Sequence, residues 1–146
     1  MATIPREQSR VEPSRSPCPL ASILDLVGDK WSLLIIRDMM FMKKRLFNEF
    51  LESGERISTN ILASRLKLLE AKGLVVKEPY QSRPVRYAYS LTDAALDLFP
   101  ILVEMAKWAN KHIPGTMHPP QQAVDAFLAE HGDKFGELSL QFNAPG

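Results

Sequence analysis

A polar-faced helix, a glycine and a two-stranded hairpin with a basic tip follow one another between Ile57 and Thr92. This order predicts a mainly α fold with a small β-hairpin wing, the winged helix-turn-helix. Beyond Thr92, an apolar pattern too broad for one buried face continues to His112. A helix that is apolar on more than one face must bury more than one face, so we expect dimerisation through the N- and C-terminal helices.

The length of 146 residues and the hydrophobic content of 45% allow one hydrophobic core. We expect a disordered N-terminal arm at residues 1–17, the winged domain with its dimerisation helices at 18–112, and an extension with a further helix at 113–146. Residues 30–90 hold twelve Lys/Arg and six Asp/Glu, whereas the rest of the chain holds six and eleven. A basic central segment favours a nucleic-acid partner.

No stretch approaches the roughly 20 apolar residues that cross a bilayer, and residues 1–19 lack the apolar core of a signal peptide. We therefore expect a cytoplasmic protein with no membrane partner. A single cysteine suits a reducing compartment. His112, His118 and His131 are too scattered for a recognised metal spacing, and the sequence has neither a phosphate-binding glycine loop nor a catalytic constellation. We expect no metal, no cofactor and no enzymatic activity.

The first two helices follow from capping residues and apolar spacing. Cys18–Val27 is predicted to be a short helix that stops at Gly28, and Asp29 to cap a second helix that runs to about Met42. The apolar residues at core spacing are Leu20, Ile23, Leu24 and Val27 in the first helix, then Trp31, Leu34, Ile35 and Met39 in the second.

A basic turn, Lys43-Lys44-Arg45, precedes a short helix at Phe47–Leu51, and Gly54–Arg56 forms the next turn. The polar helix follows. Together these segments have the order of a helix-turn-helix pair.

The polar helix is predicted from its ends and its two faces. Ser58 is a good N-cap because its hydroxyl can accept a free N–H of the first turn, and Gly73 tolerates the left-handed conformation that ends a helix. Leu62, Leu66 and Leu69 recur on one face. The opposite face carries Thr59, Asn60, Ser64 and Lys67. Side chains of these types contact base edges and phosphates in the major groove, although any surface helix is polar outside.

The hairpin is predicted from two strand patterns, Val75–Tyr80 and Arg86–Leu91. Pro79 lacks an N–H and favours an edge position. Arg83 and Arg86 then stand on a protrusion beside the polar helix, within reach of phosphates or a minor groove. Simple solvation is the alternative for two arginines on a turn. Their place beside the polar helix favours DNA contact.

Asp93–His112 is predicted to be one helix with two apolar stripes, and Pro100 to kink it. The first stripe consists of Leu96, Phe99, Val103 and Ala106. A small domain has too little core to cover the second stripe as well, unless Gln121–His131 folds back over it within the same chain. We favour a homodimer, with an interface of Leu20, Ile23, Leu24, Leu98, Ile101, Leu102, Met105 and Trp108.

The chain resembles the HxlR-type transcription regulators, relatives of the MarR group, over about residues 18–112. Individually the shared motifs are weak, but their ordered combination is specific. They are Cys18-Pro19, Gly28-Asp29-Lys30-Trp31, Phe47-Asn48-Glu49-Phe50, Ile57-Ser58, Leu62, Arg65-Leu66, Leu69-Glu70, Gly73-Leu74-Val75, Tyr87, Ser90-Leu91-Thr92, Pro100 and Trp108.

The resemblance implies a dimeric DNA-binding protein that represses or activates neighbouring genes in bacteria or archaea. It implies that the Ser58–Lys67 helix enters the major groove of a double-stranded DNA operator, with Arg83–Arg86 as the wing. We expect Asn60 and Ser64 to contact bases. The expected phosphate contacts are Thr59, Arg65, Lys67, Lys43 and Lys44. Arg65 projects sideways on the helix, so pairing with Glu70 or another acid is an alternative for it.

Some family members sense electrophiles, aldehydes or oxidants through a cysteine near the N-terminus, and Cys18 stands where that cysteine often does. By this resemblance Cys18 is a candidate redox sensor, and a small molecule or oxidant a candidate effector. Against it, a lone cysteine beside a helix start is more often a packed side chain, and the nearest cation in sequence is Arg15. The competing hypothesis for the whole chain is a winged-helix protein–protein interaction module, against which the basic bias argues.

Overall fold

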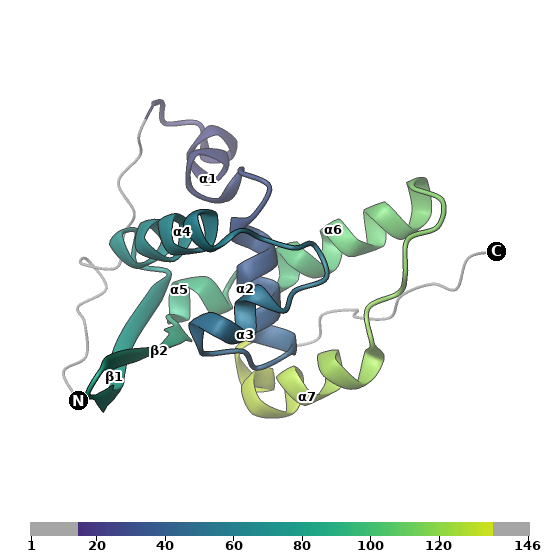
Figure 1. Ribbon diagram of the computed structural model, residues 1–146. Coiled ribbons are helices and arrows are strands. Elements are labelled where there is room, and N and C mark those ends of the chain that lie inside the picture. Colours follow the sequence, from purple (N-terminus) through teal and green to yellow (C-terminus); the bar gives the residue numbers. More distant parts are fainter. Residues whose placement is uncertain (1–14, 136–146) are drawn as a thin grey trace.

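The computed structural model describes residues 15–135, so the arm expected at 1–17 lies outside the described residues up to residue 14. Within them the elements are α1 (Pro19–Val27), α2 (Ser32–Phe41), α3 (Phe47–Leu51), α4 (Thr59–Ala71), β1 (Val75–Ser82), β2 (Val85–Leu91), α5 (Asp93–Leu96), α6 (Phe99–His112), α7 (Gln121–His131) and the short η1 (Gly132–Lys134). Figure 1 shows α2 at the centre, α4 and the hairpin on one side of it, and α6 projecting from the other.

Helix α4 has the ends that the sequence predicts. The Ser58 hydroxyl accepts a hydrogen bond from the Ile61 backbone N–H at 3.2 Å, and Gly73 follows the helix at φ 79°. Glycine adopts this left-handed conformation without the cost that a Cβ would add. Leu62, Leu66 and Leu69 are no more than 2% exposed. Their burial determines which face of α4 points outward.

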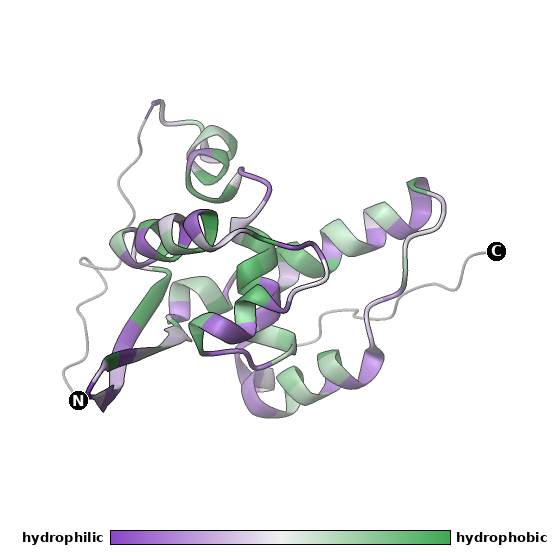
Figure 2. Ribbon diagram, viewed as in Figure 1, coloured by the Kyte–Doolittle hydropathy of each residue, from purple (hydrophilic) through white to green (hydrophobic). Residues whose placement is uncertain are grey.

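The predicted two-stranded wing is confirmed. β1 and β2 pair antiparallel, beginning with Val75 opposite Leu91, and the register shifts between Pro79 and Gln81. The shift lies beside the proline, which has no N–H to donate to a ladder. The turn at Arg83-Pro84 separates the two strands. Figure 2 shows the apolar start of β1 giving way to hydrophilic residues toward this tip.

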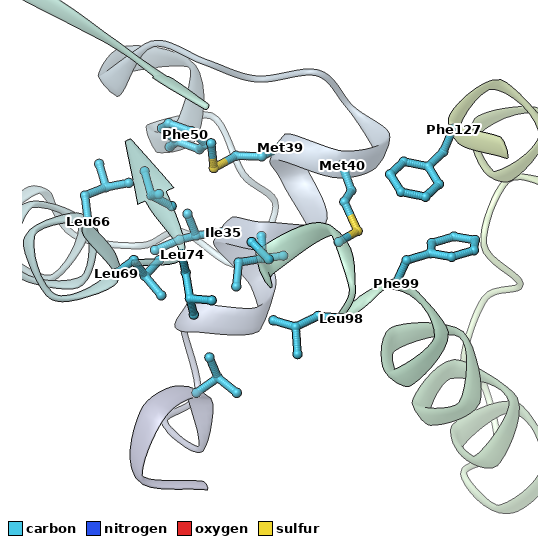
Figure 3. Packing of buried hydrophobic residues seen from close by; sticks show 14 of the residues in the cluster. Ile35, Met39, Met40, Phe50, Leu66, Leu69, Leu74, Leu98, Phe99 and Phe127 are labelled. Atoms are coloured by element: carbon cyan, nitrogen blue, oxygen red, sulfur yellow. The ribbon is translucent and has the colours of Figure 1, made fainter. Parts of the chain in front are cut away.

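The core beneath α4 joins the helix-turn-helix to the base of the wing. Figure 3 shows side chains from α2, α3 and α4 meeting around the residues that start the hairpin. Phe50 of α3 is 1% exposed, and its ring lies edge-on to the ring of Tyr89 of β2, with the ring centroids 6.3 Å apart. Dense packing of this kind holds α4 and the wing in a fixed relation. The residues labelled in this part of the core are Ile35, Met39, Phe50, Leu66, Leu69 and Leu74.

The expectation of one continuous helix over Asp93–His112 is wrong. Asp97 and Leu98 separate α5 from α6. Pro100 consequently lies in the first turn of α6, where its missing N–H breaks no helical hydrogen bond, and it does not kink a longer helix. The same turn directs Leu98 into the core at 8% exposure. Its expected place in a dimer interface is therefore wrong.

Helix α7 folds back onto the protomer and packs against Phe99 of the first apolar stripe. Phe127 stacks on Phe99 of α6 with ring centroids 4.4 Å apart, and it meets Phe41 of α2 at 5.9 Å. Phe127 is 3% exposed and Val124 is 2% exposed. Burying side chains of this size contributes about 1.5–3 kcal/mol each. The extension thus contains the predicted helix, and that helix is part of the core.

The second apolar stripe consists of Leu98, Ile101, Leu102, Met105 and Trp108. Three of these residues remain exposed in the described part of the chain, Ile101 at 40%, Met105 at 52% and Trp108 at 61%. Leu20 and Leu24 of α1 are also exposed, whereas Ile23 and Leu102 pack partly against the core. Residues 15–135 of a single protomer therefore leave apolar side chains of α1 and of α6 uncovered.

Candidate nucleic-acid interface

The outward face of α4 presents a row of small and polar side chains. Ala63 is exposed among them, four residues from both Thr59 and Lys67. The sequence analysis did not include Ala63 in the DNA-facing surface, because alanine has no hydrogen-bonding group. Its spacing from Thr59 and Lys67 places it on the same helix face. A methyl group at this place permits close approach to bases and can contact the thymine methyl. The four predicted residues, Thr59, Asn60, Ser64 and Lys67, are all exposed.

The tip of the wing has a defined shape and free cations. The Gln81 side-chain amide donates to the carbonyl oxygens of Arg83 and Pro84, each at 3.2 Å. Arg83 and Arg86 are exposed. Within residues 15–135, no carboxylate forms an ion pair with either guanidinium. Both are therefore available to an anionic partner.

Helix α4 follows a short helix and a turn, and a wing follows α4, as in known DNA-binding proteins. The family model described as HxlR-like helix-turn-helix matches residues 26–117. The chain belongs to this family.

Three similar proteins illustrate the match to the HxlR-like family. The uncharacterised HTH-type transcriptional regulator Rv3095 of Mycobacterium tuberculosis is 37% identical over 110 residues, which are 75% of this chain and 68% of Rv3095. The structure of PA1607, a candidate transcription factor, matches with a TM-score of 0.63 at 38% identity, covering 72% of this chain and 73% of PA1607. The oxidised form of the redox regulator HypR matches with a TM-score of 0.57 at 35% identity, covering 64% of this chain and 95% of HypR.

Membership of the HxlR-like family makes the chain a DNA-binding transcriptional regulator with a winged helix-turn-helix. The alternative of a winged-helix interaction module finds no support among these relatives. In helix-turn-helix proteins the second helix of the motif lies in the major groove. In this HxlR-family chain the second helix is α4.

Arg65 of this HxlR-family protein forms an ion pair within the protomer. Its Nε lies 3.5 Å from Asp29 Oδ2, which fits the alternative that it pairs with an acid. The same carboxylate accepts the backbone N–H groups of Trp31 and Ser32, each at 3.0 Å. Burial opposes ionisation of Asp29, but the hydrogen bonds from Ser32 and Trp31 and the charge of Arg65 outweigh it and lower its pKa. Arg65 thus connects α4 to the start of α2.

Lys43 and Lys44 lie in the turn after α2, and each has an acidic partner. The Lys43 ammonium is 3.7 Å from the Glu130 carboxylate of α7, and both side chains are more than half exposed. The Lys44 ammonium is 3.4 Å from Asp38, which is 2% exposed. The Lys44 side chain is 15% exposed. Its charge therefore compensates a buried carboxylate. The sequence had predicted a phosphate contact for Lys44 and not this ion pair.

The turn that leads into α4 is tied to α2 by a second ion pair. Arg37 donates to both carboxylate oxygens of Glu55, at 2.7 and 3.1 Å, and its guanidinium also contacts Asp38 at 2.7 Å. The hydrogen bonds from Arg37 and from the Ser53 hydroxyl lower the pKa of Glu55 to about 2. A bidentate arginine fixes direction as well as distance, so this pair orients the turn of the helix-turn-helix.

Cys18 is exposed and stands at the N-cap of α1. Its carbonyl accepts the Ser22 N–H at 3.0 Å. Arg15, the cation nearest to it in sequence, is bound 2.7 Å from the Asp25 carboxylate. The thiol is therefore accessible at the start of the helix that exposes Leu20 and Leu24.

Across residues 15–135, no three His, Cys, Asp or Glu side chains are grouped so that they could hold a metal ion. Over the same span, none of the helices has the length and apolar character needed to cross a membrane.

Proposed function

We propose that this regulator binds a roughly twofold symmetric operator as a homodimer, with α4 of each subunit in successive major grooves about one helical turn apart. The observation that carries this proposal is that Asn60, Ser64 and Lys67 are exposed on one face of α4, while Arg83 and Arg86 of the wing are exposed and form no ion pair within residues 15–135. Amide and hydroxyl groups suit base edges, and unpaired cations suit phosphates.

The proposed contacts follow from which side chains are free. Asn60 and Ser64 contact bases, Thr59 and Lys67 contact phosphates, and Arg83 and Arg86 contact the backbone or the minor groove beside it. Arg65 and Lys44 act through their ion pairs with Asp29 and Asp38, because a phosphate would have to displace those carboxylates. Ser58 supports the first turn of α4 through its hydrogen bond.

The dimer proposal rests on exposed apolar side chains of α1 and of α6. Within residues 15–135, Leu20, Leu24, Met105 and Trp108 are each more than half exposed. Large exposed apolar patches mark interaction sites in soluble proteins. A second copy supplies the same surface, and the twofold axis between the copies would set the separation of the two α4 helices.

A fluorescence anisotropy titration tests the proposal, with the duplex upstream of the protein's own gene and a shuffled duplex of the same composition. We expect tighter binding to the first duplex. We also expect log K to fall linearly with log salt, with a slope of about −0.9 for each phosphate neutralised. Equal affinity for both duplexes at every salt concentration contradicts sequence-specific binding.

An oxidant-responsive form of this function is favoured by one observation, the accessible Cys18 thiol at the start of α1. A structurally similar protein, HypR, is described as a redox regulator. Diamide would oxidise two thiols of a dimer to a disulfide, taking up their two protons and two electrons. Such a bond would rearrange the helices that carry Leu20 and Leu24 and change the separation of the two α4 helices.

DNA affinity of the wild type and of Cys18→Ser, each before and after diamide, tests this form. We expect diamide to change the affinity of the wild type only. An unchanged wild-type affinity, or an equal response in the variant, removes Cys18 as a sensor.

A further inference from the structure

A pocket of about 390 Å³ opens between the C-terminal end of α2, the base of β2 and helix α7. Its inner part is apolar, since Met39, Met40 and Phe127 line it and are 8%, 5% and 3% exposed. Its outer part is charged, since the exposed Lys43, Arg45 and Glu130 also line it. The volume lies in the range of small-molecule sites, which combine an apolar lining with a few polar groups.

The outer part of the pocket carries excess positive charge. The Arg45 guanidinium donates to the Ser90 hydroxyl at 3.0 Å and to the Tyr89 carbonyl at 3.4 Å, both uncharged acceptors. Lys43 approaches Glu130 only to 3.7 Å, at the exposed edge. An anionic group between Arg45 and Lys43 would therefore meet two cations and one competing carboxylate.

One wall of this pocket lies beyond the region shared with the family. Phe127 and Glu130 belong to α7, whereas the HxlR-like family model ends at residue 117. Phe127 is fixed by its stack on Phe99, so the wall is part of the folded core. The extension thus supplies this wall, and the remaining lining residues lie within the region that the family model matches.

We propose that this pocket binds a small carboxylate with an aromatic or aliphatic body. The carboxylate lies between Arg45 and Lys43, and the body packs against Met39, Met40 and Phe127. Charge-assisted hydrogen bonds fix the anionic end, and burial of the apolar body supplies the rest of the affinity. All of the lining residues belong to one protomer, and none of them is among the residues proposed above to contact DNA.

The methionines provide a direct readout of binding. Protein labelled with ¹³C at the methionine methyl groups is titrated with 2-naphthoate and followed by NMR. We expect the Met39 and Met40 signals to shift, while the exposed Met105 and Met117 signals, which are outside the pocket, stay in place. The uncharged 2-naphthamide has the same shape, and we expect it to bind at least about tenfold more weakly, which corresponds to about 1.4 kcal/mol.

Two variants with opposite expected effects test the charge argument. Lys43→Gln should weaken 2-naphthoate binding several-fold, and Glu130→Gln should strengthen it by removing the competing carboxylate. Both side chains are more than half exposed, so the fold should persist. Lys111→Gln, at an exposed lysine outside the pocket, should leave the affinity unchanged.

Equal binding of the amide, comparable shifts of Met105 and Met117, or weaker binding by Glu130→Gln would overturn the proposal. None of these measurements contains DNA. Their failure would leave the proposed DNA contacts standing, and failure of the DNA titrations would leave the pocket standing.

Discussion

Arg65, in the middle of α4, lies 3.5 Å from the carboxylate of Asp29 at the start of α2. The same carboxylate accepts two backbone N–H groups of the turn that begins α2. One carboxylate therefore holds the turn that leads into α2 and also pairs with α4. Rotation of α4 about its axis would separate this pair and would also turn Asn60 and Ser64 away from the outward face. The ion pair consequently helps to determine which residues α4 presents.

The first prediction concerns Asp29→Ala. Loss of its hydrogen bonds to the turn before α2 should lower the unfolding free energy by about 1 kcal/mol at pH 7. Because the folded pKa of Asp29 is lowered, its contribution is present above its ordinary pKa and is lost as the pH falls through the folded value. Urea unfolding should therefore show a gap between wild type and variant at pH 7 that narrows at pH 3. Glu104→Ala, at a 74% exposed side chain, should show almost no gap at either pH.

The second prediction concerns Glu55→Gln in the turn before α4. The pKa of Glu55 is about 2, below its ordinary value of 4.5. Its ion pair with Arg37 therefore stabilises the fold above pH 4.5, and this contribution disappears between pH 4.5 and 2. The side chain is 42% exposed, so solvent screening limits the loss of unfolding free energy in Glu55→Gln at pH 7 to about 1 kcal/mol. Urea unfolding of the wild type and of the variant measures this difference from pH 7 to 2. A difference that stays constant over this range would contradict the prediction.

Much of the winged domain was predictable because local sequence determines it. Ser58 and Gly73 fix the ends of α4 through a side-chain cap and a left-handed backbone, and both properties belong to single residues. The strand patterns around Arg83 likewise identified the hairpin, because alternation has a period of two residues. The exposed face of α4 followed from the buried one.

What the sequence did not predict depends on contacts between distant segments. Lys44 looks like a free basic residue until the fold places its ammonium beside Asp38. Leu98 fits the apolar periodicity of a long helix, but the break before α6 turns it into the core. The stack of Phe127 on Phe99 joins residues 28 positions apart. Periodicity describes a helix face and does not say which neighbour covers it.

The third prediction separates base contacts from phosphate contacts. Asn60→Ala should reduce the affinity for the specific duplex by about 1–3 kcal/mol and leave binding to a shuffled duplex nearly unchanged. Lys67→Ala should weaken both duplexes alike and reduce the magnitude of the salt slope by about 1. Anisotropy titrations at several salt concentrations measure both quantities. Equal losses on both duplexes in both variants would refute this division.

The fourth prediction concerns the apolar surface of α6. Met105→Asp places a charge in the proposed interface, where burying it unpaired is costly. We expect sedimentation velocity to show a shift from dimer to monomer, with a parallel loss of operator affinity. Met117→Asp is the matched control, because Met117 is 89% exposed and lies after α6. A wild-type protein that sediments as a monomer at micromolar concentration, or a dimeric Met105→Asp, contradicts the interface.

The fifth prediction concerns α7, which lies beyond the matched family region. Phe127 is 3% exposed and its ring contacts Phe99, Phe41 and Phe135. Removing a buried phenylalanine leaves a cavity, so Phe127→Ala should lower the unfolding free energy by about 3–5 kcal/mol in a single cooperative transition.

Gln122→Ala lies on the same helix at an exposed position and should change stability by less than about 0.5 kcal/mol. If Phe127→Ala costs no more than this control, α7 is an appendage and not part of the core. If instead the variant unfolds in two steps, α7 packs on the domain but unfolds separately from it. A single transition with a large loss shows that this extension stabilises the same hydrophobic core that positions α4.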